Sequence, residues 1–338
     1  MSATINDVAR EAGVSITTVS RALNNNYPVS KEAREKIEKA VERLNYKPNI
    51  VARSLVLKKT SMIGVIIPGI TNMFFPIIVE EIDNILRTKG YSLSLCNTRG
   101  DCKTEVDLVE NIILRGMDGI IAIDPSFENI QNGYYEKINK IIPTIIINAN
   151  SEEYKCNFVS YDEEAGTVEA FDYLFKLGHS RIAFIRGDKS YSYNLKEKMY
   201  KRIIKEKELK YQKIINVGMG NSIEVVNKTE TSFKKLLDTQ ERPTSVFCCN
   251  DLMALGVINA CNKAGLCVPE DISVIGFDNT LLSDVSHPKI TTVDLNMKEI
   301  GRIAALELVS IISRGISCRK KTVLDTKLII KESCSRPL

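Results

Sequence analysis

A helix predicted near the N-terminus carries side chains that could read DNA. The helix is capped by Ser15 and runs to about Leu23, and its outward face carries Ile16, Thr17, Ser20, Arg21 and Asn24. Hydroxyl, guanidinium and amide groups of this kind hydrogen-bond to base edges and phosphates in a major groove. A merely solvated face would more often carry Glu and Lys, and a three-helix protein-interaction module is the alternative.

A second set of polar and aromatic residues follows predicted strands in the rest of the chain. Phe74 and Phe75 come after the first strand, and Asn148, Asn250 and Asp278 directly follow later ones. Ligands of open parallel sheets bind beyond the carboxyl ends of the strands. Aromatic rings cover the apolar face of a sugar, while amides and carboxylates exchange hydrogen bonds with its hydroxyls. These residues therefore predict a pocket for a polyhydroxylated ligand.

Two of these positions have a structural alternative. Phe75 is as well suited to a hydrophobic core as to a pocket. The pair Asn250-Asp251 can cap the helix that begins near Leu252, because Asn and Asp are both favoured N-cap residues. We expect Asp251 to be the cap and Asn250 to face the ligand.

The elements that position the first set are three short helices. Thr4 and Asp7 predict a capping box, and Gly13 is placed to end the first helix in a left-handed turn. A third helix is expected from Ser30, with Ile37 and other apolar residues turned inward. Helix, tight turn, helix and supporting helix is the helix-turn-helix layout.

Charge is distributed unevenly along the chain. Residues 1–60 carry eleven Lys and Arg against six Asp and Glu, or +5, whereas the remainder carries 35 against 36, or −1. Clustered basic residues favour a phosphate backbone because they release its counterions. The expected partner of this segment is double-stranded DNA.

Composition excludes several other classes of protein. No apolar run approaches the ~20 residues of a membrane helix, and the first residues lack the layout of a signal peptide, so we expect a cytoplasmic protein without a membrane partner. Nine cysteines occur without a CxxC pair, which favours reduced thiols over a disulfide framework or a metal site. No nucleotide-binding loop or catalytic motif is present, so we expect neither a cofactor nor enzymatic activity.

From residue 61 short apolar runs alternate with amphipathic helices, which predicts an α/β fold of parallel sheets flanked by helices behind the all-α headpiece. We expect a headpiece at 1–48, a hinge helix and linker at 49–60, and a two-lobed ligand-binding core at 61–338. The N-lobe would comprise about 61–160 and 292–322, and the C-lobe about 161–291 and 323–338. The expected strands are 62–67, 91–96, 119–123, 144–148, 181–185, 213–217, 245–249 and 272–277.

The segment from Thr4 to Leu55 resembles the DNA-binding headpiece of the lac repressor/galactose repressor family. The motifs VAREAGVS, TVSR and LNYKPN carry the resemblance in this order and spacing. It implies that Ile16, Thr17, Ser20, Arg21 and Asn24 address the major groove. It also implies that Ser15, Thr18 and Ser30 hold phosphates, with Thr4 in the same DNA-binding set.

Within the hinge helix and linker at 49–60, the helix from Asn49 to Val56 would span only about two turns, far fewer than the ~12–15 residues that an isolated helix needs in water. The resemblance implies that it folds when two copies meet in the minor groove, where Leu55 would wedge between base pairs behind the small Ala52. Such insertion kinks the duplex. The alternative is a linker leucine that packs on the core.

The core resembles periplasmic sugar-binding proteins, which implies that Asn148, Asn250 and Asp278 contact an effector, together with Phe74, Phe75, Tyr161 and Lys196. Relatives carry arginine where this chain has Lys196, and lysine does not reproduce the bidentate fork of arginine. A phosphorylated or acidic ligand would suit the lysine, and a neutral sugar also remains open.

The resemblance as a whole implies a homodimeric repressor of carbohydrate-utilisation genes that binds a near-palindromic operator. A sugar or sugar derivative between the lobes would control operator binding, with release by the ligand as the default. The alternatives are a catabolite-control regulator with a phosphorylated carrier protein as corepressor, and a solute receptor that does not bind DNA.

Overall fold

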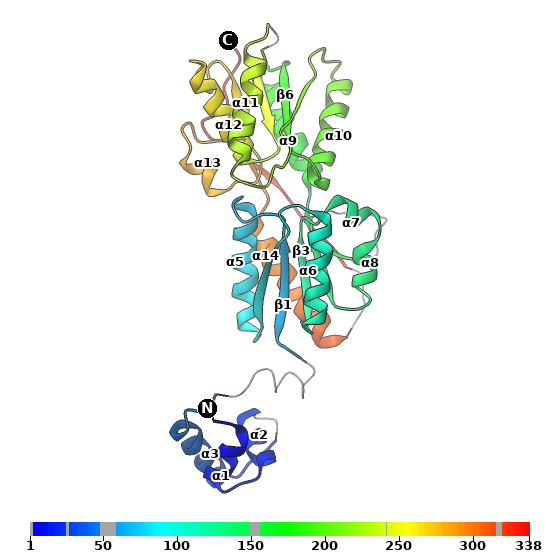
Figure 1. Ribbon diagram of the computed structural model, residues 1–338. Coiled ribbons are helices and arrows are strands. Elements are labelled where there is room, and N and C mark those ends of the chain that lie inside the picture. Colours follow the sequence, from blue (N-terminus) through cyan, green and yellow to red (C-terminus); the bar gives the residue numbers. More distant parts are fainter. Residues whose placement is uncertain (1–2, 25–26, 48–58, 149–155, 241, 316–319) are drawn as a thin grey trace. The chain divides into compact units, whose positions relative to one another are not determined.

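The computed structural model describes residues 3–24, 27–47, 59–148, 156–240, 242–315 and 320–338, in two compact units, Met1–Thr60 and Ser61–Leu338 (Figure 1). The first unit contains the three expected helices, α1 (Ile5–Ala12), α2 (Ile16–Asn24) and α3 (Lys31–Arg43). Their buried faces meet around Val8, Val19 and Ile37.

Each helix of the first unit begins at the expected cap. Thr4 accepts a hydrogen bond from the backbone N–H of Asp7 and completes the capping box, while Gly13 ends α1 at φ 65°. Ser15 accepts from the backbone N–H of Thr18 at 3.1 Å, and Ser30 accepts from Ala33 at 3.3 Å. The predicted helix-turn-helix headpiece is thus confirmed.

The second unit contains two parallel sheets. The first has six strands in the order β11-β5-β4-β3-β1-β2. All its neighbouring pairs are parallel. Its strands are β1 (Met62–Ile67), β2 (Ser92–Asn97), β3 (Gly119–Ile123), β4 (Thr144–Ile147), β5 (Asn157–Tyr161) and β11 (Lys321–Leu324).

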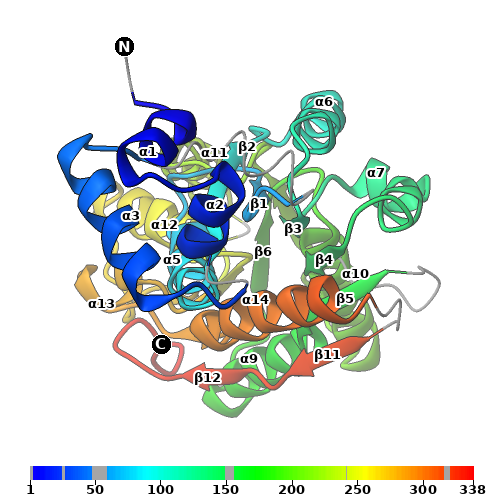
Figure 2. The same ribbon diagram turned by 90° about the horizontal axis from the view of Figure 1, so that it is seen from below.

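Helices cover both faces of this sheet. One face packs on α5 (Phe74–Thr88) and α14 (Met297–Arg314), which lie side by side (Figure 2). The other face packs on α6 (Cys102–Leu114), with α7 (Phe127–Gln131) and α8 (Tyr134–Ile138) following.

The second sheet has four parallel strands in the order β7-β6-β8-β9. They are β6 (Ile182–Arg186), β7 (Lys213–Asn216), β8 (Ser245–Cys248) and β9 (Ser273–Ile275). The helices that accompany them are α9 (Glu163–Leu177), α10 (Tyr191–Glu206), α11 (Val225–Leu237), α12 (Asp251–Lys263) and α13 (Leu281–Val285). We call the parts around the six-stranded and four-stranded sheets the N-lobe and the C-lobe.

The chain passes between the sheets after β5, between β10 (Thr292–Asp294) and α14, and between β11 and β12 (Lys327–Ile329). Strands β10 and β12 pair antiparallel. Strands β5 and β11 lie outside the strands expected from the sequence, because NFVSY and KTVL are short and mix polar with apolar residues. Helix α10 begins at Tyr191.

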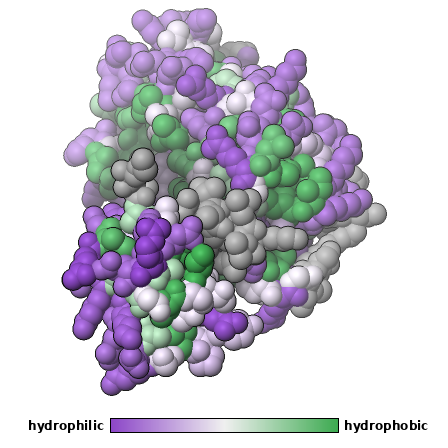
Figure 3. All heavy atoms as spheres, turned by 60° about the horizontal axis from the view of Figure 1, so that its bottom comes forward, coloured by the Kyte–Doolittle hydropathy of each residue, from purple (hydrophilic) through white to green (hydrophobic). Residues whose placement is uncertain are grey.

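Hydrophilic side chains cover most of the surface visible in Figure 3, with hydrophobic ones in smaller groups. Among the described residues, Leu114 at the end of α6 is a strongly exposed apolar residue, at 84%. No helix in the described part of the chain is long and apolar enough to cross a membrane.

Candidate functional site

The outward face of α2 is the first candidate site. Ile16 is 49% exposed, and Thr17 and Arg21 are exposed beside it, whereas Ser20 and Thr18 are half-buried. The Arg21 guanidinium carbon lies 5.1 Å from the centre of the Tyr27 ring, a distance at which a cation is attracted to an aromatic face. The structure therefore presents these side chains to solvent on one helix.

Some of the remaining predicted DNA contacts cap helices, and others lie outside the described part of the chain. Ser15, Thr4 and Ser30 use their hydroxyls as helix caps, and the Ser15 hydroxyl also lies 2.8 Å from that of Thr18. The side chain of Asn24 and the residues Ala52 and Leu55 lie outside the described part of the chain.

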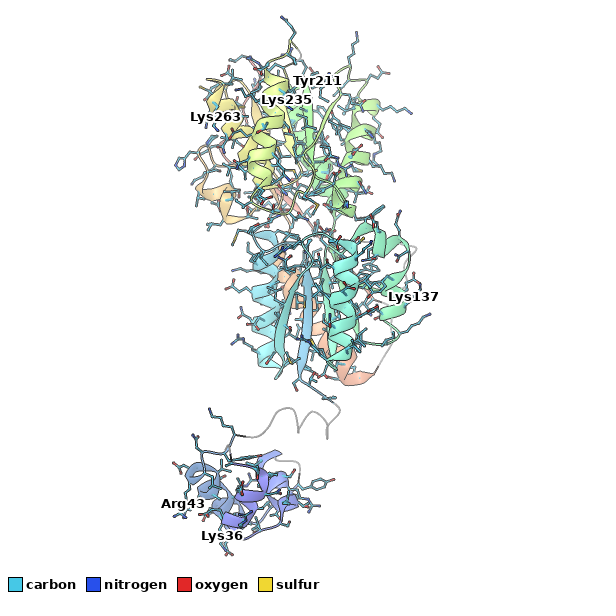
Figure 4. All side chains as sticks on the ribbon, in the orientation of Figure 1. Lys36, Arg43, Lys137, Tyr211, Lys235 and Lys263 are labelled. Atoms are coloured by element: carbon cyan, nitrogen blue, oxygen red, sulfur yellow. The ribbon has the colours of Figure 1, made fainter. Side chains whose placement is uncertain are left out.

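Basic side chains on α3 are paired with acidic neighbours. Lys36 and Arg43 project from the headpiece (Figure 4), where Lys36 contacts Glu32 at 2.8 Å and Arg43 contacts Glu11 at 2.6 Å. All four are surface residues, so these pairs contribute at most about 1 kcal/mol each.

The second candidate site is a small, closely packed cleft between the two lobes of the core. It lies at the carboxyl ends of strands from both sheets, where an open parallel sheet binds its ligand. Every predicted effector residue lines it. The lining residues are Asn72, Phe74, Phe75, Asp124, Asn148, Tyr161, Ser190, Ser192, Tyr193, Lys196, Asn221, Cys249, Asn250 and Asp278.

Three of these residues leave their strands with a left-handed backbone. The φ angles are 46° at Asp124 after β3, 64° at Asn148 after β4 and 107° at Asp278 after β9. Such conformations cost about 1–3 kcal/mol at residues other than glycine and gather at functional sites. Three residues with this backbone conformation thus lie at the strand ends that line the cavity.

Asp124 joins the two lobes through hydrogen bonds. Its carboxylate accepts from Asn148 of the N-lobe at 3.3 Å, and from Ser190 at 3.2 Å and Asn221 at 3.4 Å, both of the C-lobe. Burial, followed by the nearby charge of Glu163, raises the pKa of Asp124 to about 6. This carboxyl group is therefore costly to ionise in the closed cleft.

Lys196 is buried in an ion pair. Its side chain is 1% exposed, and its Nζ lies 2.8 Å from Glu163 and 2.8 Å from the hydroxyl of Ser192. The same nitrogen lies 3.7 Å from the centre of the Phe277 ring. Burial is the largest single effect and lowers the pKa of Lys196, but the surrounding negative charges, that of Glu163 first, together with the hydrogen bond to Glu163 raise the pKa overall. Lys196 is thus held as a cation by the chain itself.

Aromatic residues form one wall of the cavity. Phe74 packs edge-on against Phe75 at 5.1 Å and against Tyr161 at 6.4 Å, measured between ring centres. Phe75 is 1% exposed and belongs to the hydrophobic core as well as to the lining. Phe75 therefore belongs both to the hydrophobic core and to the lining of the cavity.

Asn250, and not Asp251, is the residue that caps α12. The Asn250 side chain caps α12 by accepting from the backbone N–H of Met253 at 2.9 Å, and its amide donates to the Tyr193 hydroxyl at 3.3 Å. Asp251 is no cap: its carboxylate accepts from Thr280 and Thr292 in the interior. The expectation that Asp251 caps the helix was wrong, because a side chain in the first turn is free to turn inward.

Asp278 is buried with no hydrogen-bond or ion-pair partner among the described residues, although the nearby Lys196 ammonium favours its charged form. It is 7% exposed, and its carboxylate makes no hydrogen bond or ion pair with any residue that the structure describes. Burial and the neighbouring Asp251 charge raise its pKa well above the usual value. A buried carboxylate of this kind is open to a ligand.

Several lining residues were not expected from the sequence. Asp124 directly follows the strand 119–123, so it could have been predicted from the rule that ligands bind at the carboxyl ends of parallel strands. Ser190, Tyr193 and Asn221 come from loops and a helix start that carry no periodic signal. Among the described residues, no group of three or more His, Cys, Asp or Glu is placed to hold a metal ion.

A helix-turn-helix headpiece followed by a two-lobed core with a polar cleft defines a class of ligand-responsive DNA-binding regulators. Residues 4–49 match the model of bacterial regulatory proteins of the lacI family, and residues 171–334 match the periplasmic binding protein-like domain.

Known proteins agree over nearly the full length. Catabolite control protein A of Priestia megaterium is 36% identical over 90% of this chain and 91% of its own. The ribose operon repressor of Halalkalibacterium halodurans is 31% identical over 98% and 96%. The lac repressor dimer bound to operator and the anti-inducer ONPF aligns with TM-score 0.89 and 26% identity over 99% of this chain and 100% of that one. The chain therefore belongs to the lacI family and is a transcriptional regulator.

Proposed function

We propose that this regulator is a homodimeric repressor of carbohydrate-utilisation genes whose hold on a near-palindromic operator is controlled by a carbohydrate in the cleft. The observation that carries the proposal is the cavity itself, because its polar groups come from both lobes. A ligand bound there favours one arrangement of the lobes. It can change operator affinity only as far as it binds the two arrangements with different affinity.

The relatives support the proposal by what their names and titles say. The lac repressor structure contains a dimer, an operator and an anti-inducer, and a lacI-family regulator of Enterococcus faecium, 25% identical, holds ribose. The two-fold symmetry of a dimer is mirrored in a palindromic site. For this chain the DNA contacts are those proposed for α2, and the protein acts in the cytoplasm.

A catabolite-control regulator is the second candidate, and the name of one relative favours it. In that case a phosphorylated carrier protein would bind the surface of α14. Arg302 there is paired with Glu299 at 2.7 Å, so the helix offers few free cations to a phosphate. A pull-down with the phosphorylated carrier protein separates the two candidates, since only the second predicts capture.

We infer no catalytic activity. His179 is 3% exposed and hydrogen-bonds to Ser273 at 3.1 Å and to the backbone oxygen of Ser335 at 2.9 Å. It serves a structural role between helix and strand. Turnover in a panel of hydrolase and transferase assays would contradict this inference.

The experiment that tests the proposed function has two parts. Operator fragments selected from random duplexes by the full-length protein should form a palindromic consensus, and a sugar that raises the melting temperature should alter binding to that consensus. Leu55→Gly should keep the melting shift and lose specific binding, because the hinge contact requires an apolar wedge. No consensus, or equal operator affinity in the variant, would contradict the proposal.

A further inference from the structure

The charges that face the cleft do not balance. The carboxyl groups of Asp124, Asp278 and Glu163 lie in or next to the cavity, and Lys196 is the single ammonium among them in the described part of the chain. Three acidic groups against one basic group leave an excess of two negative charges when all are ionised. Burying such charges is costly unless each is paired.

The one cation is already used. Lys196 pairs with Glu163 at 2.8 Å and also contacts Ser192, and all three side chains are more than nine-tenths buried. Because the third N–H group of Lys196 faces the backbone oxygen of Cys249 at 3.4 Å, all three donors of the ammonium already have acceptors. A phosphate group would have to displace one of them. The expectation that a phosphorylated ligand suits this lysine therefore loses its physical basis.

The start of α10 is likewise no free anion site. Its N-cap is Ser190, whose hydroxyl donates to Asp124 at 3.2 Å. A helix N-terminus attracts negative charge, and here the chain supplies a carboxylate of its own. An incoming phosphate would have to share this place with Asp124.

Asp278 is the group that calls for a ligand of the opposite charge. It is 7% exposed, lines the cavity, and has no hydrogen bond or ion pair among the described residues. Its left-handed backbone, with φ 107°, fixes the residue at the strand end at an energetic cost. A bound cation would offset the cost of burying this carboxylate in its charged form.

We propose that the ligand of this cleft is an amine-bearing monosaccharide whose ammonium group pairs with Asp278, and that phosphorylated sugars are disfavoured. The inference rests on the proposed function and names its ligand class. Phe74 and Tyr161 line the cleft with aromatic rings, and Asn148 and Asn250 line it with amides that now contact Asp124 and Tyr193 and would exchange these contacts for sugar hydroxyls.

The test compares matched sugars on the full-length protein by isothermal titration calorimetry. The panel contains glucose, galactose and mannose, their 2-amino derivatives and their 6-phosphates. Because hydrogen bonds to charged groups contribute about 1.5–3 kcal/mol, the amine of at least one set should bind roughly ten-fold or more tightly than its neutral parent. The 6-phosphate of that set should bind most weakly.

Two isosteric variants assign the preference to the cleft. Asp278→Asn should reduce the advantage of the amine over the neutral sugar to within a few-fold, and Asp124→Asn should reduce it partly. Asp238→Asn, an exposed acidic residue after α11, removes the same charge outside the cleft and should keep the preference. Circular dichroism spectra and melting curves show whether each variant is folded.

The outcomes separate the two proposals. If a neutral or phosphorylated sugar binds more tightly than its amine, the inference is overturned while the proposed carbohydrate response stands. If the amine preference survives Asp278→Asn, the assignment to this residue is overturned. If no sugar in the panel binds, the inference and the proposed carbohydrate response fail together.

Discussion

Single residues in the cleft are governed by the cost of burying charge. Lys196 and Glu163 compensate each other, whereas Asp124 accepts hydrogen bonds from neutral donors and Asp278 accepts none from the described residues. The same low exposure that strengthens each pair makes each unpaired group expensive. Changes at these residues should therefore alter stability and ligand choice together.

Removal of the buried lysine should destabilise the core. Lys196→Met leaves the Glu163 carboxylate buried without a cation, and breaking a buried pair in this way costs about 3–5 kcal/mol. Urea denaturation followed by circular dichroism measures the loss. Lys201→Met is the matched control, because Lys201 is 53% exposed in its pair with Glu197 and should cost less than about 1 kcal/mol. An equal loss of unfolding free energy in the two variants would show that the buried Lys196 pair contributes no more to stability than the exposed Lys201 pair.

The ionisation of Asp124 should make stability depend on pH. Burial, and then Glu163, raises its pKa from 3.8 to about 6. Between these values the unfolded chain has lost the proton that the folded chain keeps, so this group's contribution to stability falls as pH rises from about 4 to 6 and levels off above. Asp124→Asn should therefore become relatively more stable across that window. A difference in unfolding free energy that stays constant with pH would contradict this prediction.

Secondary-structure elements place these residues, and here the sequence was most informative. The three headpiece helices follow from their caps at Thr4, Ser15 and Ser30, since a cap is a local signal that needs no knowledge of the fold. The strand-end rule located Asn148 and Asp278 for the same reason. Their place in one cavity could be expected once parallel sheets were inferred.

The part of the site that the sequence did not predict depends on tertiary contacts. Ser190 and Asn221 lie in loops of the C-lobe and meet Asp124 only because the lobes close. The ion pair of Lys196 with Glu163 joins helices α10 and α9, whose separation along the chain carries no pairing signal. The wrong expectation for the cap of α12 has a similar cause: Asn and Asp are both favoured N-cap residues, so the sequence alone does not decide between Asn250 and Asp251.

The exposed face of α2 carries a prediction about DNA specificity. Arg21→Ala should lose about 1–3 kcal/mol of discrimination between operator and random duplex if the guanidinium reads guanine. Lys36→Ala on α3 removes one positive charge as well, but Lys36 is engaged with Glu32 and should weaken binding to both duplexes alike. Fluorescence anisotropy measures the four affinities. A loss that is the same for both duplexes in Arg21→Ala would contradict a base contact.

The core as a whole is closed by backbone contacts between its lobes. Gly69, in the loop after β1, packs so tightly that an added Cβ would clash with the backbone carbonyl oxygen of Asn221. Close by, Thr71 accepts a hydrogen bond from the backbone N–H of Ile223 at 3.0 Å. These contacts require the two lobes to be in their present arrangement.

Gly69→Ala should therefore hold the cleft open. We expect ligand affinity to fall at least roughly ten-fold, because closure must precede the contacts that bind the ligand, and small-angle scattering of the core should give a larger radius of gyration. Ile70→Ala is the control in the same loop, since Ile70 is 53% exposed. Unchanged affinity in Gly69→Ala would mean that ligand binding does not require the closed form.

The central claim is that the occupied cleft controls the hold on DNA. The direct measurement is operator affinity of the full-length protein by fluorescence anisotropy, with and without the tightest-binding amino sugar at saturation, at one fixed salt concentration. A coupling of typical size predicts a change of about 5–150-fold, absent in Asp278→Asn at the same sugar concentration. Identical operator affinity with an empty and a saturated cleft would contradict the account.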